Sequence, residues 1–342
     1  MDFTNESVRK KTIGVMQEIS KNRQPELNRT LHSLLTPAEQ EIQRFVDGLA
    51  FQEGAWYRPA HNVIVPASMI AICRYGSYST FDISGETATY IQHAPYPRDL
   101  VFVAQLHDVG NSRMKIEETT KGADWERVDK RWTHMQIGSD MLNEQLKDLR
   151  ARGILDIPDE RIAELRAIVA THDFPYIEGM PLKDPEARAH RGADRTFVPS
   201  VLSFWKDFIA YCVTPKYLDG ARKLGLELTP ETFLSARLAF FYDNRSPLST
   251  VPDALQHTHS LDKRLASWNE GGRCEPAYTD VEKRVIDAML TRRSHEVAAV
   301  TSGSMHTSDD FGALFERAFV DETTTLLSYA AGNPAALTVS PS

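Results

Sequence analysis

Helix-start signals recur along the chain, and they constrain the fold more than any other sequence feature. Capping residues followed by proline stand at Thr36, Asp184 and Thr229, and a capping box begins at Thr279. Behind such starts apolar residues recur at intervals of three and four, for example within residues 162–169. Alternating β-branched runs, which are typical of half-buried strands, are nearly absent. The sequence therefore predicts an all-α fold.

Clusters of glycine, serine, proline and charged residues mark the connections between helices. The segments 76–97 and 112–130 are predicted to be loops, the second of them a charged connector or lid. These breaks suggest a helical N-terminal arm (1–50), a central helical block (51–215) and a helical C-terminal region (216–342) that ends in a flexible tail. The sequence does not decide whether the last part is separate or packs onto the block.

Composition narrows the class of protein. With 342 residues the chain can bury a large core, and 42% apolar and 25% charged residues are ordinary for a globular protein. A net charge of −8 argues against binding to nucleic acid or to an anionic membrane surface, and no apolar run approaches the roughly 18 residues of a bilayer span. The N-terminus shows no secretory signal, and three widely spaced cysteines suit a reducing, cytoplasmic setting.

Several histidines extend the apolar faces of predicted helices. His134 and His172 lie at helical spacing from apolar residues, and His61 enters an apolar helix. His107 and Asp108 end an apolar run, where a polar pair is unusual for packing alone. Any one histidine could be a hydrogen-bonded core residue, but several unpaired polar groups in a core would be costly. A metal cluster would supply partners for all of them at once, so the joint pattern predicts a metal site.

Three stretches resemble the HD superfamily of metal-dependent phosphohydrolases, over roughly residues 55–212. The run AQLHDVGN (104–111) is the most specific, because it is very close to that family's LHDIG helix end, while HMQIG (134–138) and IVATH (168–172) resemble its next ligand helices. The resemblance implies an HD-domain-like helical bundle in which a first histidine, the His-Asp pair and a late aspartate bind one metal ion, and further histidines bind a second. Carried over residue by residue, the implied ligands are His61, His107, Asp108, His134, His172 and Asp194.

The late aspartate has two candidates. Asp194 lies in the run Ala193-Asp194-Arg195, which resembles the family's AD helix, and Asp207 lies on a later predicted helix. We favour Asp194. Imidazoles together with carboxylates suit Fe, Mn, Ni or Zn, with Mg less natural, and the two oxygens of Asp108 allow one or two ions to bind.

The resemblance implies hydrolysis of a small phosphorylated substrate, such as a nucleotide or a phosphodiester. Metal-bound hydroxide would attack phosphorus, and Asp108 or Asp173 would manage the proton. Such a site also needs cations near the metal ions, although each basic residue taken alone is more simply a solvated surface charge. The candidates for substrate binding are Arg113, Lys115 and Arg131 near the His-Asp pair and Arg195 beside Asp194, which Arg191 also flanks.

Two other functions stay open. HD-type mixed-valent di-iron oxygenases share the scaffold and the four-histidine, two-aspartate set, and they cleave C–C or C–P bonds with O₂. They commonly carry a lysine three residues after the aspartate of the His-Asp pair, where this chain has Asn111. The second possibility is a non-catalytic helical regulatory protein with a degenerate metal site. The oligomeric state is also open, and a homo-oligomer is compatible with the sequence.

Overall fold

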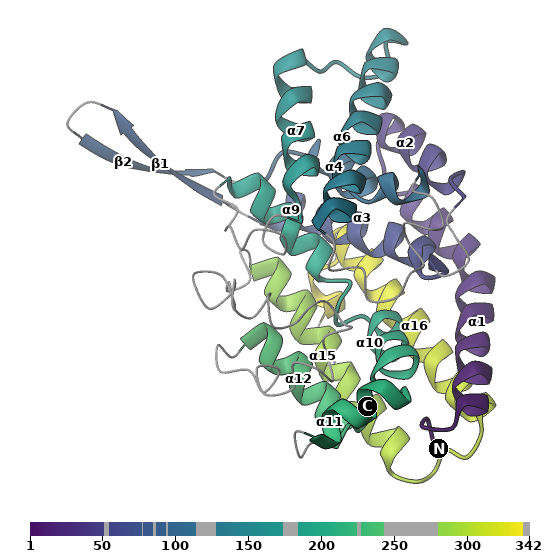
Figure 1. Cartoon of the computed structure of the whole chain (residues 1–342). Coiled ribbons are helices and arrows are strands. Elements are labelled where there is room, and N and C mark those ends of the chain that lie inside the picture. The colour runs from purple at the N-terminus through teal and green to yellow at the C-terminus, as the bar shows by residue number, and fades with distance from the viewer. Residues whose placement is uncertain are drawn as a thin grey trace.

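The computed structural model shows an all-α fold, as the sequence predicts, with one β-hairpin added to it (Figure 1). It describes residues 1–50, 55–76, 78–84, 87–93, 95–113, 128–173, 184–223, 227–242 and 280–337. The α-helices of these residues are α1 (Glu6–His32), α2 (Pro37–Asp47), α3 (Arg58–Tyr75), α4 (Leu100–Leu106), α6 (Val128–Ala151), α7 (Asp159–Thr171), α9 (Pro185–Arg195), α10 (Val201–Asp207), α11 (Pro215–Lys223), α12 (Pro230–Tyr242), α15 (Asp280–Thr301) and α16 (Ser308–Ala331). Short 3-10 helices span Val109–Arg113 and Pro334–Leu337, and a π-helical turn spans Phe208–Cys212.

Helix starts fall where the capping signals predict them. The Thr36 capping box at α2 is complete, with the hydroxyl and the partner carboxylate each accepting a backbone N–H. Asp184 accepts two backbone N–H groups from the first turn of α9, and the Thr229 hydroxyl accepts one from α12. The capping box predicted at Thr279 lies outside the described residues. Local sequence therefore sets these helix boundaries.

The segment 76–97, predicted to be a loop, contains an antiparallel hairpin instead. Strand β1 (Tyr78–Ser84) pairs along its whole length with β2 (Thr87–His93), and the hairpin projects away from the helices in Figure 1. The loop prediction is wrong because both strands hold β-branched and aromatic residues, which favour extended backbone. These strands are short, and glycine and serine beside them weaken the strand pattern in the sequence.

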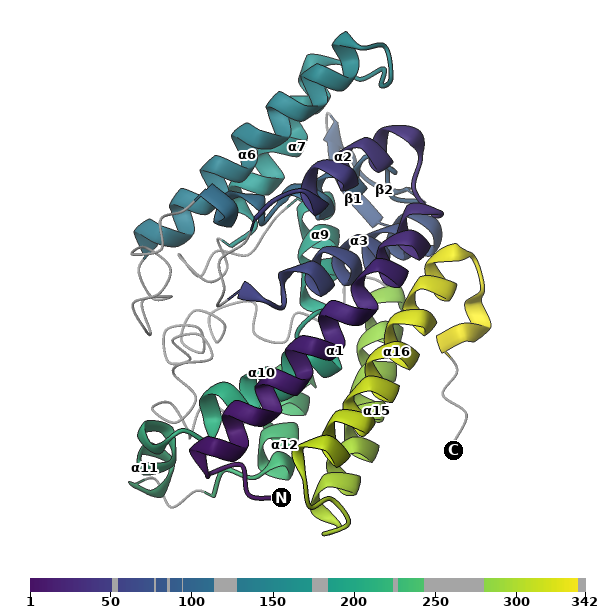
Figure 2. The same ribbon diagram turned by 90° about the vertical axis from the view of Figure 1, so that its right-hand side faces the viewer.

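The N-terminal arm and the C-terminal region, which the sequence places in separate parts, lie against each other. α1 runs alongside α16 in Figure 2 and packs on it. Arg23 of α1 pairs with Glu316 of α16 at 2.6 Å, and the Thr12 and Ser308 hydroxyl oxygens are 3.0 Å apart. α16 also packs against α3, a helix that is buried along almost its whole length. The two ends of the chain thus support the central helix.

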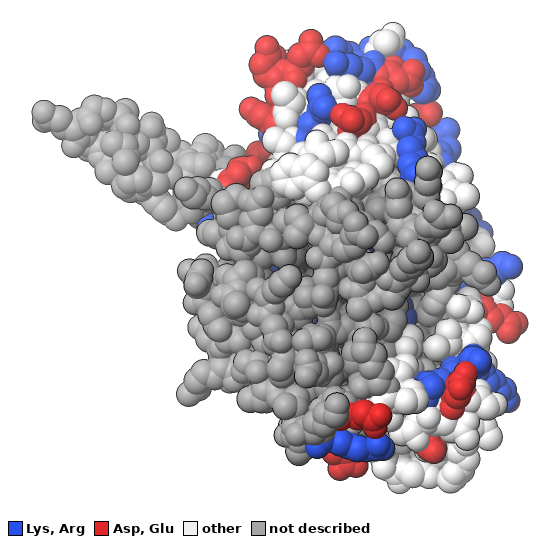
Figure 3. Space-filling model, viewed as in Figure 1, with Lys and Arg blue, Asp and Glu red and all other residues white. Residues whose placement is uncertain are grey.

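The outer surface carries mixed charge where the structure describes it. Figure 3 shows acidic and basic side chains interspersed over the part of this face formed by α6 and α7, with no broad basic patch among the described atoms. None of the described helices is both long and apolar enough to cross a membrane.

A buried charge cluster joins α10, α15 and α16. The Arg293 guanidinium is fully buried and lies 2.6 Å from Glu296 and 2.8 Å from Glu322. The Trp205 indole N–H donates to Glu296 at 2.9 Å, and Glu322 accepts the Val201 N–H. Burial raises the pKa of Glu296 to about 7, against the opposing effect of Arg293. One carboxyl group of the core therefore titrates near neutral pH.

We predict that Glu296→Gln changes the pH dependence of folding stability. The folded pKa lies above the ordinary value of 4.5, so this carboxyl makes the unfolding free energy fall as pH rises from about 4.5 to about 7. The substitution should remove a slope on the order of 1 kcal/mol per pH unit. Urea denaturation at intervals from pH 4.5 to 7.5 measures it, with Glu316→Gln at the surface as control. An unchanged slope in Glu296→Gln would refute the prediction.

Candidate metal centre

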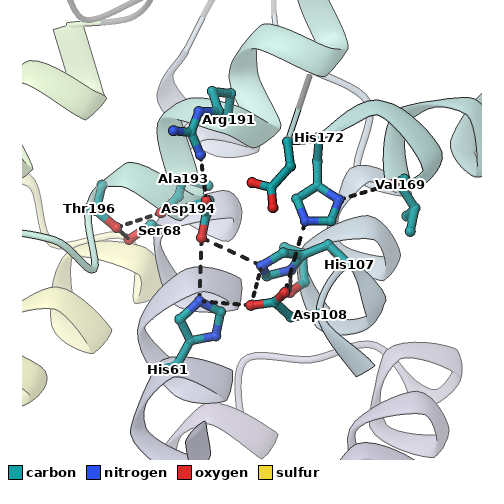
Figure 4. Close-up of polar contacts among 12 residues, drawn as sticks. His61, Ser68, His107, Asp108, Val169, His172, Arg191, Ala193, Asp194 and Thr196 are labelled. Atoms are coloured by element: carbon teal, nitrogen blue, oxygen red, sulfur yellow. Dashed lines mark hydrogen bonds and ion pairs between the residues drawn. The ribbon is translucent and has the colours of Figure 1, made fainter. Parts of the chain in front are cut away.

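The predicted ligands converge from distant parts of the chain. They are His61 on α3, His107 and Asp108 at the end of α4, His134 on α6, His172 at the end of α7 and Asp194 on α9. All four histidines are buried, and Figure 4 shows the labelled members of the set turned toward a common centre. Residues separated by up to 133 positions therefore form one site.

One group of donor atoms forms around His61 and His107. The Nε2 of His61 lies 3.3 Å from Oδ1 of Asp194 and 3.7 Å from Oδ2 of Asp108. The Nε2 of His107 lies 3.5 Å from each of these two oxygens. His61, His107 and Asp108 could hold one metal ion, and we call these three residues the first group. Asp194 adds a fourth donor beside it.

A second group forms around His134 and His172. Their Nε2 atoms lie 3.3 Å apart. From Oδ1 of Asp108, the Nε2 of His134 is 3.4 Å away and that of His172 is 3.9 Å away. Asp108, His134 and His172 could hold another metal ion, and we call them the second group. Oδ2 of Asp173 lies 3.7 Å from Nε2 of His134, so the predicted proton carrier is at the edge of this group.

Asp108 belongs to both groups through different oxygens. Its Oδ2 faces the histidines of the first group, and its Oδ1 faces those of the second. A carboxylate placed in this way can bridge two metal ions about 3.5–4 Å apart, as in two-metal hydrolytic sites. The Nδ2 of Asn111 donates to Oδ1 of Asp108 at 3.0 Å, which helps to hold the carboxylate in this orientation.

Backbone carbonyls fix the orientation of two imidazoles. The Nδ1 of His107 lies 3.1 Å from the Ala104 oxygen, and the Nδ1 of His172 lies 2.7 Å from the Val169 oxygen. Because a carbonyl can only accept, each Nδ1 carries the proton and donates it. The Nε2 lone pair of each ring is then free and faces the donor groups, as metal-binding histidines require.

The pKa shifts of both aspartates and of two histidines suit metal binding, whereas that of His107 opposes it. Burial opposes ionisation of Asp108 and Asp194, but nearby guanidinium groups and imidazoles hold both pKa values well below the ordinary value. Burial lowers the pKa of His61, and it takes that of His134 to about 4. His107 differs, because burial is outweighed by the carboxylates, which raise its pKa and favour the protonated ring, so a metal ion at Nε2 would have to displace that proton. Ionised carboxylates beside neutral imidazoles are the forms in which these side chains coordinate metals.

Two arginines contact the donor carboxylates: Arg191, which flanks Asp194 in the sequence, and Arg58, which the sequence analysis did not single out. Arg58 forms a buried ion pair with Oδ2 of Asp108, and Nη1 of Arg191 lies 2.7 Å from Oδ2 of Asp194. Each precedes a ligand of its own helix by three residues, Arg58 before His61 and Arg191 before Asp194. This spacing puts two side chains on one helix face, and it is the signal that could have found Arg58.

Two glycines let the turn after α4 approach α6 closely. A Cβ on Gly110 would overlap the backbone oxygen of His134, and a Cβ on Gly138 would lie 3.0 Å from the backbone oxygen of His107. At the first position no side chain fits unless the backbone moves. The glycine that follows the His-Asp pair therefore controls how near the first group lies to the second.

The structure distinguishes the two candidates for the late ligand. Asp194 lies beside the first group, as described above. Asp207 is buried elsewhere, between Nζ of Lys206 at 2.9 Å and the Arg237 guanidinium at 2.6 Å. Asp194 is thus the aspartate that joins the candidate metal centre, and Asp207 balances a separate pair of cations.

The four basic residues predicted to bind substrate have different surroundings. Arg113 is exposed and lies 4.0 Å from a glutamate of α6, and Arg195 is buried and pairs at 3.2 Å with a glutamate of α15. Lys115 and the side chain of Arg131 lie outside the described residues. The cations seen on the donor carboxylates are instead the two arginines that precede ligands by three residues.

Comparison of the chain with protein families, with curated proteins and with solved structures finds no match. The likeness to the HD superfamily therefore rests on the motif residues of the sequence. The candidate site rests on the donor geometry, which is independent of that likeness.

We predict that Gly110→Ala lowers the unfolding free energy by about 2 kcal/mol or more, because the added methyl group must push the turn away from α6. Gly14→Ala on α1 is the matched control, since a Cβ there meets nothing within 4 Å. It should stabilise the protein by about 0.5–1 kcal/mol through helix propensity. Guanidinium denaturation measures both. A Gly110→Ala protein as stable as the wild type would show that the turn and α6 are not in this close contact.

Proposed function

We propose that this chain is an HD-type metal-dependent hydrolase that acts on a small phosphorylated substrate, such as a nucleotide or a phosphodiester. The observation that carries the proposal is the pair of donor groups that share Asp108. The Nε2 atoms of His134 and His172 lie 3.3 Å apart, a separation that suits either a hydrogen bond between the two rings or two ligands of one metal ion. A metal ion between such nitrogens would satisfy both lone pairs.

The donor set suits a divalent transition metal. Imidazole nitrogens favour Fe, Mn, Ni or Zn, whereas Mg prefers oxygen ligands. The first group together with Asp194 would hold one ion, and the second group would hold another. Ions bound there would lower the pKa of a coordinated water and offset negative charge on a phosphoryl oxygen.

The chain's own side chains would bind the substrate and carry the proton. Arg58 and Arg191 each neutralise a donor carboxylate, and a phosphate group is the kind of anion that guanidinium groups bind with two hydrogen bonds. Asp173 lies 3.7 Å from His134 and its side chain is 13% exposed. It can therefore accept a proton at the edge of the site and release it to solvent.

The net charge of the chain favours a small substrate over a nucleic-acid polymer. The chain carries a net charge of −8, and the described part of the face in Figure 3 mixes acidic and basic side chains. A nucleic-acid polymer needs a broad basic surface, while a small molecule needs only the cations at the centre. We place the activity in the cytoplasm, in keeping with the sparse cysteines.

The direct test is phosphate release from a panel of nucleotides and phosphoesters with Mn, Fe, Ni or Mg supplied. We expect turnover of at least one member with a transition metal, and less with Mg, because the donor set is rich in imidazole. The same preparation is assayed for bound metal. A protein that binds metal and releases no phosphate from any member would contradict the hydrolase.

Two single variants test the roles of the side chains. Arg58→Gln should raise KM about tenfold or more, because it removes a charged donor to the substrate anion, and Asp173→Asn should lower kcat. Arg113→Gln is the matched control, since Arg113 is an exposed arginine beside a glutamate of α6. Steady-state kinetics separates the two parameters. Equal KM values for Arg58→Gln and Arg113→Gln would remove Arg58 from the substrate site.

A di-iron oxygenase is the second candidate, and one observation favours it. The four histidines divide two and two between groups that share a single carboxylate, which suits a pair of like ions. At the position where such oxygenases carry lysine, Asn111 donates to Asp108 instead. Iron content by elemental analysis together with a mixed-valent EPR signal would favour the oxygenase.

A protein that binds metal but shows neither hydrolase nor oxygenase activity would favour the regulatory alternative.

A further inference from the structure

A fifth histidine lies beside the candidate metal centre, and no described residue gives it a polar partner. His190 on α9 is fully buried, and neither its Nδ1 nor its Nε2 has a hydrogen-bond partner in the part of the chain that the structure describes. A buried polar group left unpaired costs about 1–3 kcal/mol. Folded proteins seldom keep such a group unless a water molecule or an ion binds to it. The burial of His190 therefore calls for a ligand.

His190 packs on histidines of both donor groups. Its ring centroid lies 4.8 Å from that of His107 and 6.0 Å from that of His172. The histidines of the two groups keep a similar spacing, because the centroids are 5.2 Å apart for His61 with His107, for His107 with His172 and for His134 with His172. His190 is thus part of one cluster of imidazole rings, at the junction between the groups.

The helix that carries His190 also turns it toward the centre. Asp194 follows it by four residues on α9, so the two side chains lie one helical turn apart on the same face. α9 packs against α3, α4 and α7, which are the helices that carry His61, His107 and His172. The face of α9 that presents Asp194 to the first group therefore presents His190 to the same cluster.

We propose that His190 is a further ligand of the metal centre. The inference rests on the metal site of the proposed function and adds a ligand to the six that the sequence predicts. A transition-metal ion binds a neutral imidazole well, and it would give His190 the polar partner that the described residues do not supply. His190 is outside the two groups whose donor atoms already converge, so its ring must turn toward the ion as the ion binds.

The test uses His190→Phe, which keeps a flat ring and removes both nitrogens. The metal-free variant should be as stable as the wild type or more stable, because two unpaired buried nitrogens are gone. Cobalt(II) should bind at least about tenfold more weakly, and the visible absorption of the bound ion should change. His32→Gln at the end of α1 removes a histidine that pairs with Asp47 instead, and it should bind cobalt like the wild type.

Three results would overturn the proposal. They are a His190→Phe protein with the wild-type affinity and spectrum, a destabilised metal-free variant with unchanged cobalt binding, and a wild-type protein that binds no cobalt. A failure of the proposed hydrolase activity can be told apart from these three results. A wild type that binds cobalt through His190 but releases no phosphate would contradict the reaction alone, and the loss of affinity in His190→Phe would still support the ligand.

Discussion

The site depends on the position of one partly buried carboxylate, that of Asp108. Asp108 presents one oxygen to the histidines of each donor group, so it joins ligands from α3, α4, α6 and α7 into a single centre. A buried carboxylate is costly unless it is fully paired, and here Arg58 and the surrounding imidazoles keep it ionised. The close approach at Gly110 is what brings the two halves within reach of the same side chain.

The last ligand helix links this centre to the C-terminal region. Next to Asp194 on α9, Arg195 pairs with the buried Glu282 of α15, and Gly192 leaves room for that carboxylate, because a Cβ there would overlap it. The part of α9 that carries Asp194 is therefore held from outside the stretch that resembles the HD superfamily. The C-terminal helix α15 therefore helps to position Asp194, one of the predicted ligands. The region also packs directly on the central helix α3 through α15 and α16.

Much of the fold and of the candidate site follows from local sequence. Capping residues such as Thr36 mark where helices begin, and helical spacing places the four predicted histidines on buried faces. Arg58 was missed because arginine is usually exposed, and only tertiary packing reveals that it is buried on a carboxylate. Arg113 was favoured for its nearness in sequence to the His-Asp pair, but sequence nearness does not set the direction of a side chain. The sequence could not single out His190, because only the packing of α9 against α3, α4 and α7 shows that its ring is buried with no partner among the described residues.

The most direct measurement is the amount of metal bound by protein purified without added metal, determined by elemental analysis for the wild type and for Asp108→Ala. Because Asp108 belongs to both donor groups, we expect the wild type to hold up to two transition-metal ions per chain and the variant to lose both. Asp47→Ala, at a surface pair with His32, should retain them. A wild type without metal, or an Asp108→Ala protein that binds as much metal as the wild type, would contradict the shared-carboxylate centre.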